Sequence, residues 1–233
     1  MRTTTSAYWS IPAKRAPVAF GAVRELLQVA PDEVGAAFGF DSPDSAWVYC
    51  AFPGDGADDE RTLAAWRSAF RPGEPRTETS LPDATGVALP ARSFTAAAVF
   101  VDGLSDELID LLVELAGRAP KDASIYVAAS RGAVAKVIVS ETAYPLRQPG
   151  FHVSVWAPWT NVADRLASEE WTARFETAMR PLGRLAYVNY LGASSADRVR
   201  DAYGSNYGRL AQIKGRYDPA NLFRTNHNIL PAL

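Results

Sequence analysis

The segment from residue 151 to 156 alternates polar and apolar side chains and carries one of the two histidines of the chain. It reads FHVSVW, so a period of two places His152, Ser154 and Trp156 together on one face of a strand. Because an imidazole titrates close to neutral pH, a histidine that faces a ligand transfers protons readily. The pattern predicts His152 as a catalytic acid or base and Ser154 and Trp156 as substrate contacts. An ordinary hydrogen-bonded histidine explains the same pattern equally well.

Arg147 and Tyr49 complete the predicted catalytic set. Arg147 follows Pro145 shortly before this strand, and its planar guanidinium fits a carboxylate or enolate oxygen. A structural ion pair with Glu141 is the competing interpretation of Arg147. Tyr49 offers a phenol that polarises a substrate carbonyl.

Several aromatic side chains occur at strand spacing or close to the predicted strands. Together they predict an aromatic lining suited to a large apolar ligand, although aromatic residues at such spacing more often belong to a core. The predicted substrate-binding set, besides Ser154 and Trp156, is Trp47, Tyr126, Tyr144 and Tyr190. Trp159 belongs to the same lining.

The elements that must position these residues are strands interleaved with helices. Helical periodicity marks residues 17–30, 58–70, 105–119 and 168–182. Strand patterns mark residues 33–40, 46–52, 93–101, 124–130, 133–142 and 151–156, and the turn formers of residues 41–45 make the first two an antiparallel hairpin. Because most connections are short, the order predicts an α+β fold with one large antiparallel sheet and its helices on one face. The other face of the sheet is then open to a ligand or a partner.

Composition narrows the possible partners. The chain has 233 residues, 48% of them hydrophobic, and a formal net charge of -2, so no basic surface indicates nucleic acid or anionic lipid. The single cysteine excludes an internal disulfide, and the two histidines form no metal-binding pattern. No apolar leader or spanning segment is evident, and we expect a cytoplasmic protein without a metal.

The C-terminal stretch from residue 187 to 231 has its own pattern of predicted secondary structure. We expect a short strand, a helix that ends at Gly204 and a second helix of about three turns that ends before Asp218-Pro219. Apolar side chains on the second helix form one stripe, namely Tyr207, Leu210, Ile213 and Tyr217. We therefore divide the chain into a substrate-type α+β domain, residues 1–186, and a tail, residues 187–233, packed on it as one compact unit.

The order YxNY, AYG, RL, IKxxYDPxNxF and NxNIxP in this stretch closely resembles the C-terminal signature of the berberine-bridge-enzyme-like FAD-linked oxidases. Further upstream, RGAVAKV and ETAYPLR are similar to the GGAVxxV strand and the TAFxHR corner of that family. The resemblance implies the substrate (cap) domain of the vanillyl-alcohol-oxidase-type flavoproteins, whose open sheet face looks at the flavin ring. It also implies that His152 takes the place of the family's acid or base. The positions matching residues that approach the flavin are Tyr187, Asn189 and Asn226 to Asn228, with His227 where the family usually has glutamine.

The family's flavin-binding domain has no counterpart in this sequence. We therefore expect a flavin-free, non-redox enzyme of secondary metabolism that folds a large apolar substrate, of polyketide type, for cyclisation, cycloaddition or rearrangement. Two alternatives stay open. The chain is the substrate-binding half of a split oxidase that receives FAD from a separate domain, or it binds a hydrophobic metabolite without turnover. An open sheet face and an apolar tail further predict a homodimer.

Overall fold

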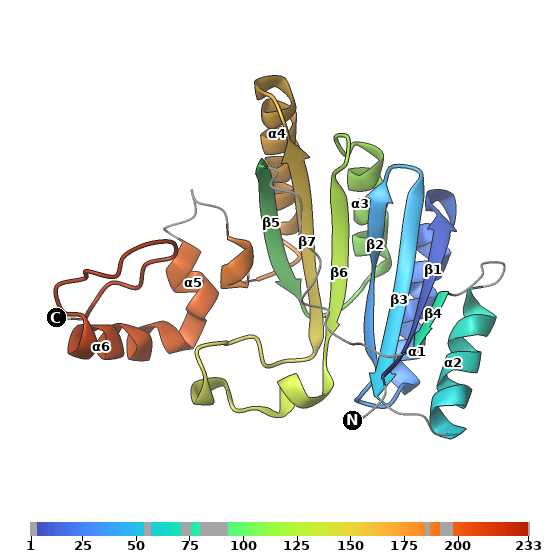
Figure 1. Cartoon of the computed structure of the whole chain (residues 1–233), viewed down its shortest axis with the longest axis horizontal. Coiled ribbons are helices and arrows are strands. Elements are labelled where there is room, and N and C mark those ends of the chain that lie inside the picture. The colour runs from blue at the N-terminus through green and yellow to red at the C-terminus, as the bar shows by residue number, and fades with distance from the viewer. Residues whose placement is uncertain are drawn as a thin grey trace.

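The fold is built on one seven-stranded sheet (Figure 1). The computed structural model describes residues 4–53, 57–70, 76–79, 93–184, 187–191 and 198–232. All neighbouring strands are antiparallel, in the order β4-β1-β3-β2-β6-β7-β5. The strands are β1 Thr4–Pro12, β2 Gly35–Ser42, β3 Ser45–Pro53, β4 Arg76–Thr79, β5 Ser93–Val101, β6 Ser124–Ser130 and β7 Gly150–Trp159. The predicted α+β class with a large antiparallel sheet is confirmed.

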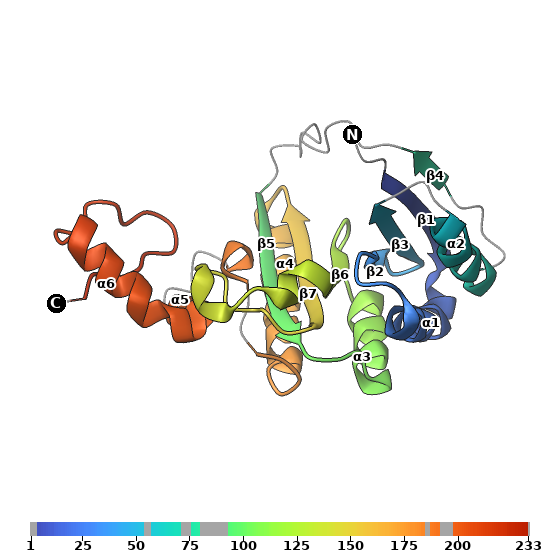
Figure 2. The ribbon, with the colours of Figure 1, turned by 90° about the horizontal axis from the view of Figure 1, so that it is seen from below.

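Four helices cover one face of this sheet and leave the other open (Figure 2). They are α1 Ala16–Val29, α2 Ala57–Ala69, α3 Asp106–Gly117 and α4 Val162–Met179. Alternation along the strands supplies the core beneath them: on β7, Val153, Val155 and Ala157 are completely buried in the main hydrophobic cluster. The intervening residues of β7 face the open side, as the sequence predicted.

Local signals start and stop these helices. The Ser105 hydroxyl caps α3 by accepting a hydrogen bond from the Leu108 amide at 3.2 Å. Asn161 caps α4 in the same way through the Asp164 amide at 2.9 Å. The sequence placed the start of α4 at Ser168, which was wrong. Glu169 lies inside the helix instead, and its carboxylate pairs with Arg165 one turn earlier.

Two predicted strands do not form. Residues 133–142 leave the sheet in two 3-10 turns, Gly132–Lys136 and Val139–Glu141, because β7 occupies the place beside β6. Gly132 makes the exit with φ +66, close against the Asp32 backbone, where a Cβ would lie 2.3 Å from the carbonyl oxygen. Residues 188–190 form a 3-10 turn, Val188–Tyr190, rather than a strand. In the opposite sense, β1 and β4 were not predicted.

The tail lies beyond the β5 edge of the sheet (Figure 1). It contains α5, Val199–Tyr203, a 3-10 turn and α6, Tyr207–Tyr217. Gly204 ends α5 with a positive φ, and α6 stops at Asp218, both as predicted. A small apolar cluster of Ala98, Leu191, Val199 and Ala202 fixes the tail to the open face at β5. The Asn206 side chain adds hydrogen bonds to the carbonyls of Val139 and Thr142 at 2.8 and 3.0 Å.

The predicted stripe on α6 does not become its buried face. Only Ala211 of this helix is buried, while Ile213 and Tyr217 are exposed. Leu222 and Phe223, just past the helix, are exposed too, with Phe223 81% accessible. Among the described residues, no helix is long and apolar enough to cross a membrane, and no group of acidic, histidine or cysteine side chains is arranged to hold a metal ion.

Candidate functional site

Strand register places two of the predicted catalytic residues in one row across the open face. His152 pairs with Ala128, Ala128 with Ala37, and Ala37 with Tyr49. The row therefore has a floor of two alanines with a larger side chain at each end. Three strand spacings separate His152 from Tyr49, a distance of about 14 Å. The two residues can contact opposite ends of one extended ligand, but not the same reacting atom.

His152 is paired with a tyrosine from the irregular corner that precedes β7. The Tyr144 hydroxyl lies 2.7 Å from His152 Nε2, and the Phe100 ring packs edge-on at 5.0 Å between centroids. Burial lowers the pKa of His152 below its ordinary value of 6.5, so the imidazole is neutral near pH 7. This pair combines a predicted catalytic residue with a predicted substrate contact.

The unpaired ring nitrogen of His152 indicates its tautomer. His152 Nδ1 is buried and has no hydrogen-bond partner within the described structure. A buried N–H without an acceptor is costlier than an unfilled lone pair, which favours the proton on Nε2. In this tautomer, Nε2–H donates to the Tyr144 oxygen. His152 then stabilises a negative charge that develops on that oxygen.

A second tyrosine, from the tail, borders the pair. The rings of Tyr144 and Tyr187 meet edge-to-face at 5.4 Å, and Asn189 Nδ2 donates to the Tyr187 hydroxyl at 2.7 Å. Burial, with a smaller contribution from nearby Tyr187, raises the pKa of Tyr203. These tyrosines line a cavity of about 170 Å³ between the corner and the tail. In the sequence, Tyr187 was linked to a flavin only through the family resemblance. The structure adds its ring contact with Tyr144, which joins two segments far apart in the chain.

Arg147 acts as a brace for Tyr144. Its guanidinium lies 4.9 Å from the centre of the Tyr144 ring, and Nε donates to the Tyr144 carbonyl at 3.2 Å. A further bond joins it to the Thr142 hydroxyl. An ion pair with Glu141 is not supported, because the hydrogen bonds of the Arg147 guanidinium go to the Thr142 hydroxyl and to a backbone carbonyl. Arg147 therefore positions Tyr144, and its catalytic role remains a prediction.

Trp47 and Tyr126 form a separate aromatic cluster on the other half of the open face, with Tyr8 of β1. Tyr8 and Trp47 stack at 6.0 Å between ring centroids, and Trp47 meets Tyr126 at 5.5 Å. The indole can cross β2 because Gly39 lies beneath it: a Cβ on Gly39 would be 3.3 Å from Trp47 and 1.9 Å from the Ile125 carbonyl oxygen. Trp47 is only 8% exposed, whereas Tyr126 is 38% exposed. Tyr126 is therefore the more accessible of the two predicted substrate contacts.

A carboxylate, which the sequence did not single out, lies at the margin of this cluster. The Tyr8 hydroxyl donates to Asp41 Oδ2 at 3.4 Å. Partial burial raises the pKa of Asp41, and the Tyr8 hydroxyl and Trp47 indole oppose that rise. Asp41 and Gly39 are two residues apart on β2, so both lie on the open face. The alternation of the strand could therefore have predicted Asp41 as an open-face residue from the sequence.

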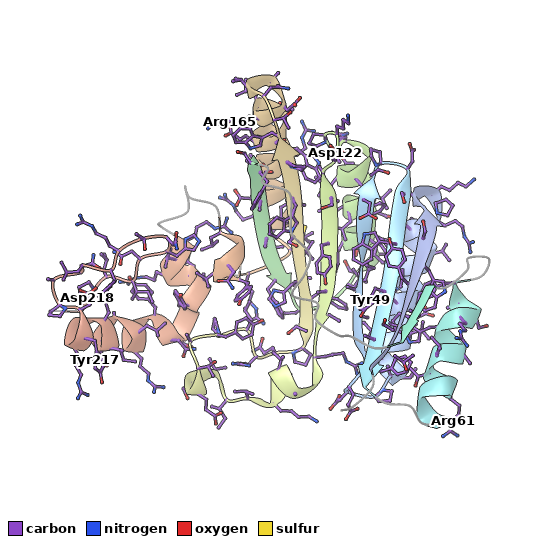
Figure 3. The ribbon with its side chains drawn as sticks, viewed as in Figure 1. Tyr49, Arg61, Asp122, Arg165, Tyr217 and Asp218 are labelled. Carbon is purple, nitrogen blue, oxygen red and sulfur yellow. The ribbon has the colours of Figure 1, made fainter. Side chains whose placement is uncertain are left out.

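The remaining predicted contacts are less open to a ligand. Ser154 is buried, and its hydroxyl is directed at the Tyr126 carbonyl at 3.4 Å. Trp156, two residues beyond Ser154 on the same face of β7, packs against Phe94 with 5.2 Å between ring centroids. Tyr190 closes the 3-10 turn of the tail, and its side chain lies outside the described part of the chain. Figure 3 shows Tyr49 on the open face and Tyr217 and Asp218 in the tail, well apart from it.

The tail contains a larger groove of about 1230 Å³, next to the small cavity. Val188 and Tyr203 line both spaces and so connect the Tyr144–His152 pair with the tail. Polar side chains gather along the groove, namely Asn189, Asn226, His227 and Asn228. Asn228 Oδ1 is buried there without a hydrogen-bond partner in the described structure. An unpaired buried amide oxygen requires a donor, which a bound ligand can supply.

Comparison with known proteins gives a family match in the tail. Residues 186–230 match the family described as berberine and berberine like. An uncharacterized FAD-linked oxidoreductase of Bacillus subtilis, YvdP, is 30% identical over 132 residues, which cover 56% of this chain and 30% of the relative. The chain is similar to the berberine-like FAD-linked oxidoreductases. Berberine bridge enzyme-like C-1 of Nicotiana tabacum is also 30% identical, over 136 residues that cover 44% of this chain and 24% of the relative.

Solved structures of larger proteins share the fold. The BBE-like 1 protein of Physcomitrella patens superposes with a TM-score of 0.82 at 20% identity, covering 98% of this chain and 54% of that protein. A chitooligosaccharide oxidase gives 0.80 at 18% identity, with 99% and 56% covered. At these identities the likeness establishes the fold alone. The chain spans little more than half of each solved neighbour and under a third of the curated relatives described above.

Proposed function

We propose that this chain supplies the substrate-binding and proton-transferring face of a berberine-like FAD-linked oxidoreductase. The observation that carries the proposal is the 2.7 Å contact between the Tyr144 hydroxyl and His152 Nε2, where the open face meets the tail. Catalytic pairs of this kind combine a group that exchanges a proton with a second group that stabilises its charge. The aromatic face beside the pair suits a large, mostly apolar substrate such as an aromatic natural product of polyketide type.

Tyr144 is the group we assign to the substrate. In the assigned tautomer, His152 Nε2–H stabilises the phenolate oxygen, so Tyr144 can give its proton to a substrate oxygen or take one from it. Arg147 positions Tyr144 in two ways: its guanidinium lies over the face of the Tyr144 ring, and its Nε donates to the Tyr144 backbone carbonyl. The Tyr187 ring packs edge-to-face against Tyr144 and narrows the space in which the substrate oxygen must lie.

The tail groove fits the polar edge of a flavin. Asn189, Asn226 and Asn228 offer amide donors and acceptors, and the unpaired Asn228 oxygen matches a ring N–H or a ribityl hydroxyl. When bound, FAD supplies the capacity to accept a hydride from the substrate. Val188 and Tyr203 line both the tail groove and the small cavity, so the groove adjoins the cavity that Tyr144 lines.

The mass of the product tests the proposal. The protein is incubated with FAD and a panel of phenolic and polyketide-type substrates, and products are identified by mass spectrometry. Oxidation yields a product lighter by two hydrogens, with turnover lost in Tyr144→Phe. If products form equally well with Tyr144→Phe, or none forms while FAD is bound, the proposal fails.

The second candidate is a flavin-independent ring closure or rearrangement at the same site. It is favoured by the Tyr144–His152 pair itself, because proton transfer and carbonyl polarisation require no electron carrier. The same incubation distinguishes it, since an isomerisation gives a product of unchanged mass that forms equally well without FAD.

A second copy of the chain is our proposed partner for the tail. Exposed apolar side chains around the end of α6, among them Tyr217, Leu222 and Phe223, make a surface that water solvates poorly. Light scattering should give the mass of a dimer, and Leu222→Ser with Phe223→Ser should give that of a monomer. A wild-type monomer at high concentration would contradict this assignment.

A further inference from the structure

The helix layer leaves one part of the sheet uncovered, on the face opposite His152. Along β7, Val153, Val155 and Ala157 are fully buried beneath the helices, but Phe151, on the same side, is only half-buried. A cavity of about 610 Å³ opens over Phe151. It lies between the last turns of α1, the β5–α3 connection and the adjoining ends of β6 and β7. Its volume is that of a site for a small organic ligand.

The floor and one wall of this cavity are apolar. Phe151 and Ala129 contribute the sheet side, Leu27 comes from α1 and Leu104 from the β5–α3 connection. Phe151 is held in place by an edge-to-face contact with Phe38, 6.3 Å between ring centroids. An apolar chain or ring placed here would shield the exposed part of Phe151 from water.

Two guanidinium groups border the apolar surface. Arg24 uses a single nitrogen, Nη1, for both of its hydrogen bonds, to the Leu104 carbonyl at 2.9 Å and to Asp106 at 2.7 Å. Its Nε and Nη2 make no hydrogen bond within the described part of the chain. Arg131 donates to the carbonyls of Ala30 and Pro31 at the end of α1, which fixes the guanidinium beside the opening, and its Nη2 lies 3.9 Å from the Asp32 carboxylate.

The acidic side chain among the lining residues is already neutralised. Asp102 is paired with Arg184 at 2.5 Å. The cavity therefore combines an apolar floor, the guanidinium of Arg131, which is paired with Asp32, and that of Arg24, which is paired with Asp106 through Nη1 alone and keeps Nε and Nη2 for a further acceptor. We infer that this cavity binds a small apolar molecule carrying a carboxylate, with its hydrocarbon part on Phe151 and Leu104 and its carboxylate on Arg24.

The inference concerns the helix-covered face, so it does not depend on the reaction assigned to the open face. His152 is not among the lining residues of this cavity. Ligand binding here and turnover at Tyr144 can therefore succeed or fail separately.

Titration calorimetry with 4-phenylbutyrate and its neutral analogue 4-phenylbutyramide tests the assignment. We expect the acid to bind about tenfold more tightly than the amide, since a charge-assisted bond replaces a neutral one. Arg24→Gln should remove that preference. Arg118→Gln is the matched control, because Arg118 also pairs with a carboxylate of α3, Glu114, but does not line the cavity.

Methyl NMR locates the ligand, with shifts expected at Leu27 and Leu104 in wild type and in His152→Phe. Absence of binding at millimolar acid, equal affinity for acid and amide, or an unchanged preference in Arg24→Gln would each overturn the assignment. Shifts confined to the open face would overturn it as well.

Discussion

The two aromatic clusters of the open face differ in how their polar atoms are used. Around β7, His152 Nε2 is hydrogen-bonded to the Tyr144 hydroxyl and the Asn189 amide to the Tyr187 hydroxyl, beside the small cavity that the two tyrosines line. Across β1, β3 and β6, the rings of Tyr8, Trp47 and Tyr126 contact one another in series, and the Tyr8 hydroxyl donates to Asp41 at the margin. The first arrangement suits proton transfer, and the second suits holding a flat apolar ligand. Variants of the first should change turnover, and variants of the second should change affinity.

The largest effect is expected from the Tyr144–His152 pair. Tyr144→Phe removes the hydroxyl that exchanges the proton, and His152→Phe removes the donor that stabilises it. Each should lower kcat by roughly 10²–10⁴-fold with a smaller change in KM. The double variant should be little worse than either single one, because the groups act as a unit.

Tyr217→Phe is the control for this pair, since Tyr217 is exposed on α6 and lines neither the small cavity nor the tail groove. Equal losses of kcat in Tyr217→Phe, or wild-type turnover in Tyr144→Phe, would remove the distinction between the clusters.

A change beneath the second cluster should affect the fold and the ligand together. In Gly39→Ala the new Cβ would meet the Ile125 carbonyl oxygen at 1.9 Å, so β2 and β6 must shift and Trp47 with them. We expect the free energy of unfolding in urea to fall by roughly 1–3 kcal/mol, as for other overpacked sites. Gly35→Ala, on the same strand, meets only the Ala51 carbonyl oxygen at 3.7 Å and should cost much less. Equal stability of the two variants would show that Trp47 does not depend on the space at Gly39.

Tyr126 should affect affinity without affecting chemistry. Tyr126→Leu removes the exposed ring of the second cluster, and we expect ligand dissociation constants to rise about fivefold to tenfold with kcat unchanged. Phe94→Leu, which removes an exposed ring on the outer row beside Trp156, serves as control. A loss of kcat in Tyr126→Leu would assign chemistry to both clusters.

The smallest predicted effect is a pH dependence of stability. Burial lowers the pKa of folded His152 below 6.5, so the unfolded chain binds this proton more readily than the folded one. The corresponding stability is complete above the unfolded pKa of 6.5 and is lost as the pH falls through 6.5 toward the lower folded value. Urea unfolding at a series of pH values should show this decline in wild type and a flatter curve in His152→Gln. Identical curves would indicate that His152 is not desolvated.

The sequence correctly predicted those strands and helices whose side chains repeat with a period of two or 3.6 residues. The outward set on β7 and the hairpin of β2 and β3 were predicted because each repeat is complete within one segment. The strand expected at residues 133–142 failed because its alternation is not accompanied by a free neighbour in the sheet. β1 was missed because its polar threonines and serines mask the buried Ala7, Trp9 and Ile11.

The site was less predictable than the fold, since its contacts join distant or irregular segments. His152 and Tyr144 were each singled out, but for different roles, and only the corner before β7 brings them to 2.7 Å. Tyr187 reaches them from the tail, after α4 has crossed behind the sheet. Nothing local to Gly39 shows that an indole two strands from Tyr126 will lie over it.

The most direct test of the open-face site is amide shift mapping with lumiflavin, the bare flavin ring, by NMR. We expect shifts grouped at the corner of residues 143–146, at residues 187–191 and along the tail groove near Asn228, all reduced in Asn228→Leu. Shifts confined to the helix-covered face, or none at saturating lumiflavin, would contradict the assignment of the open face and tail to the flavin and the substrate.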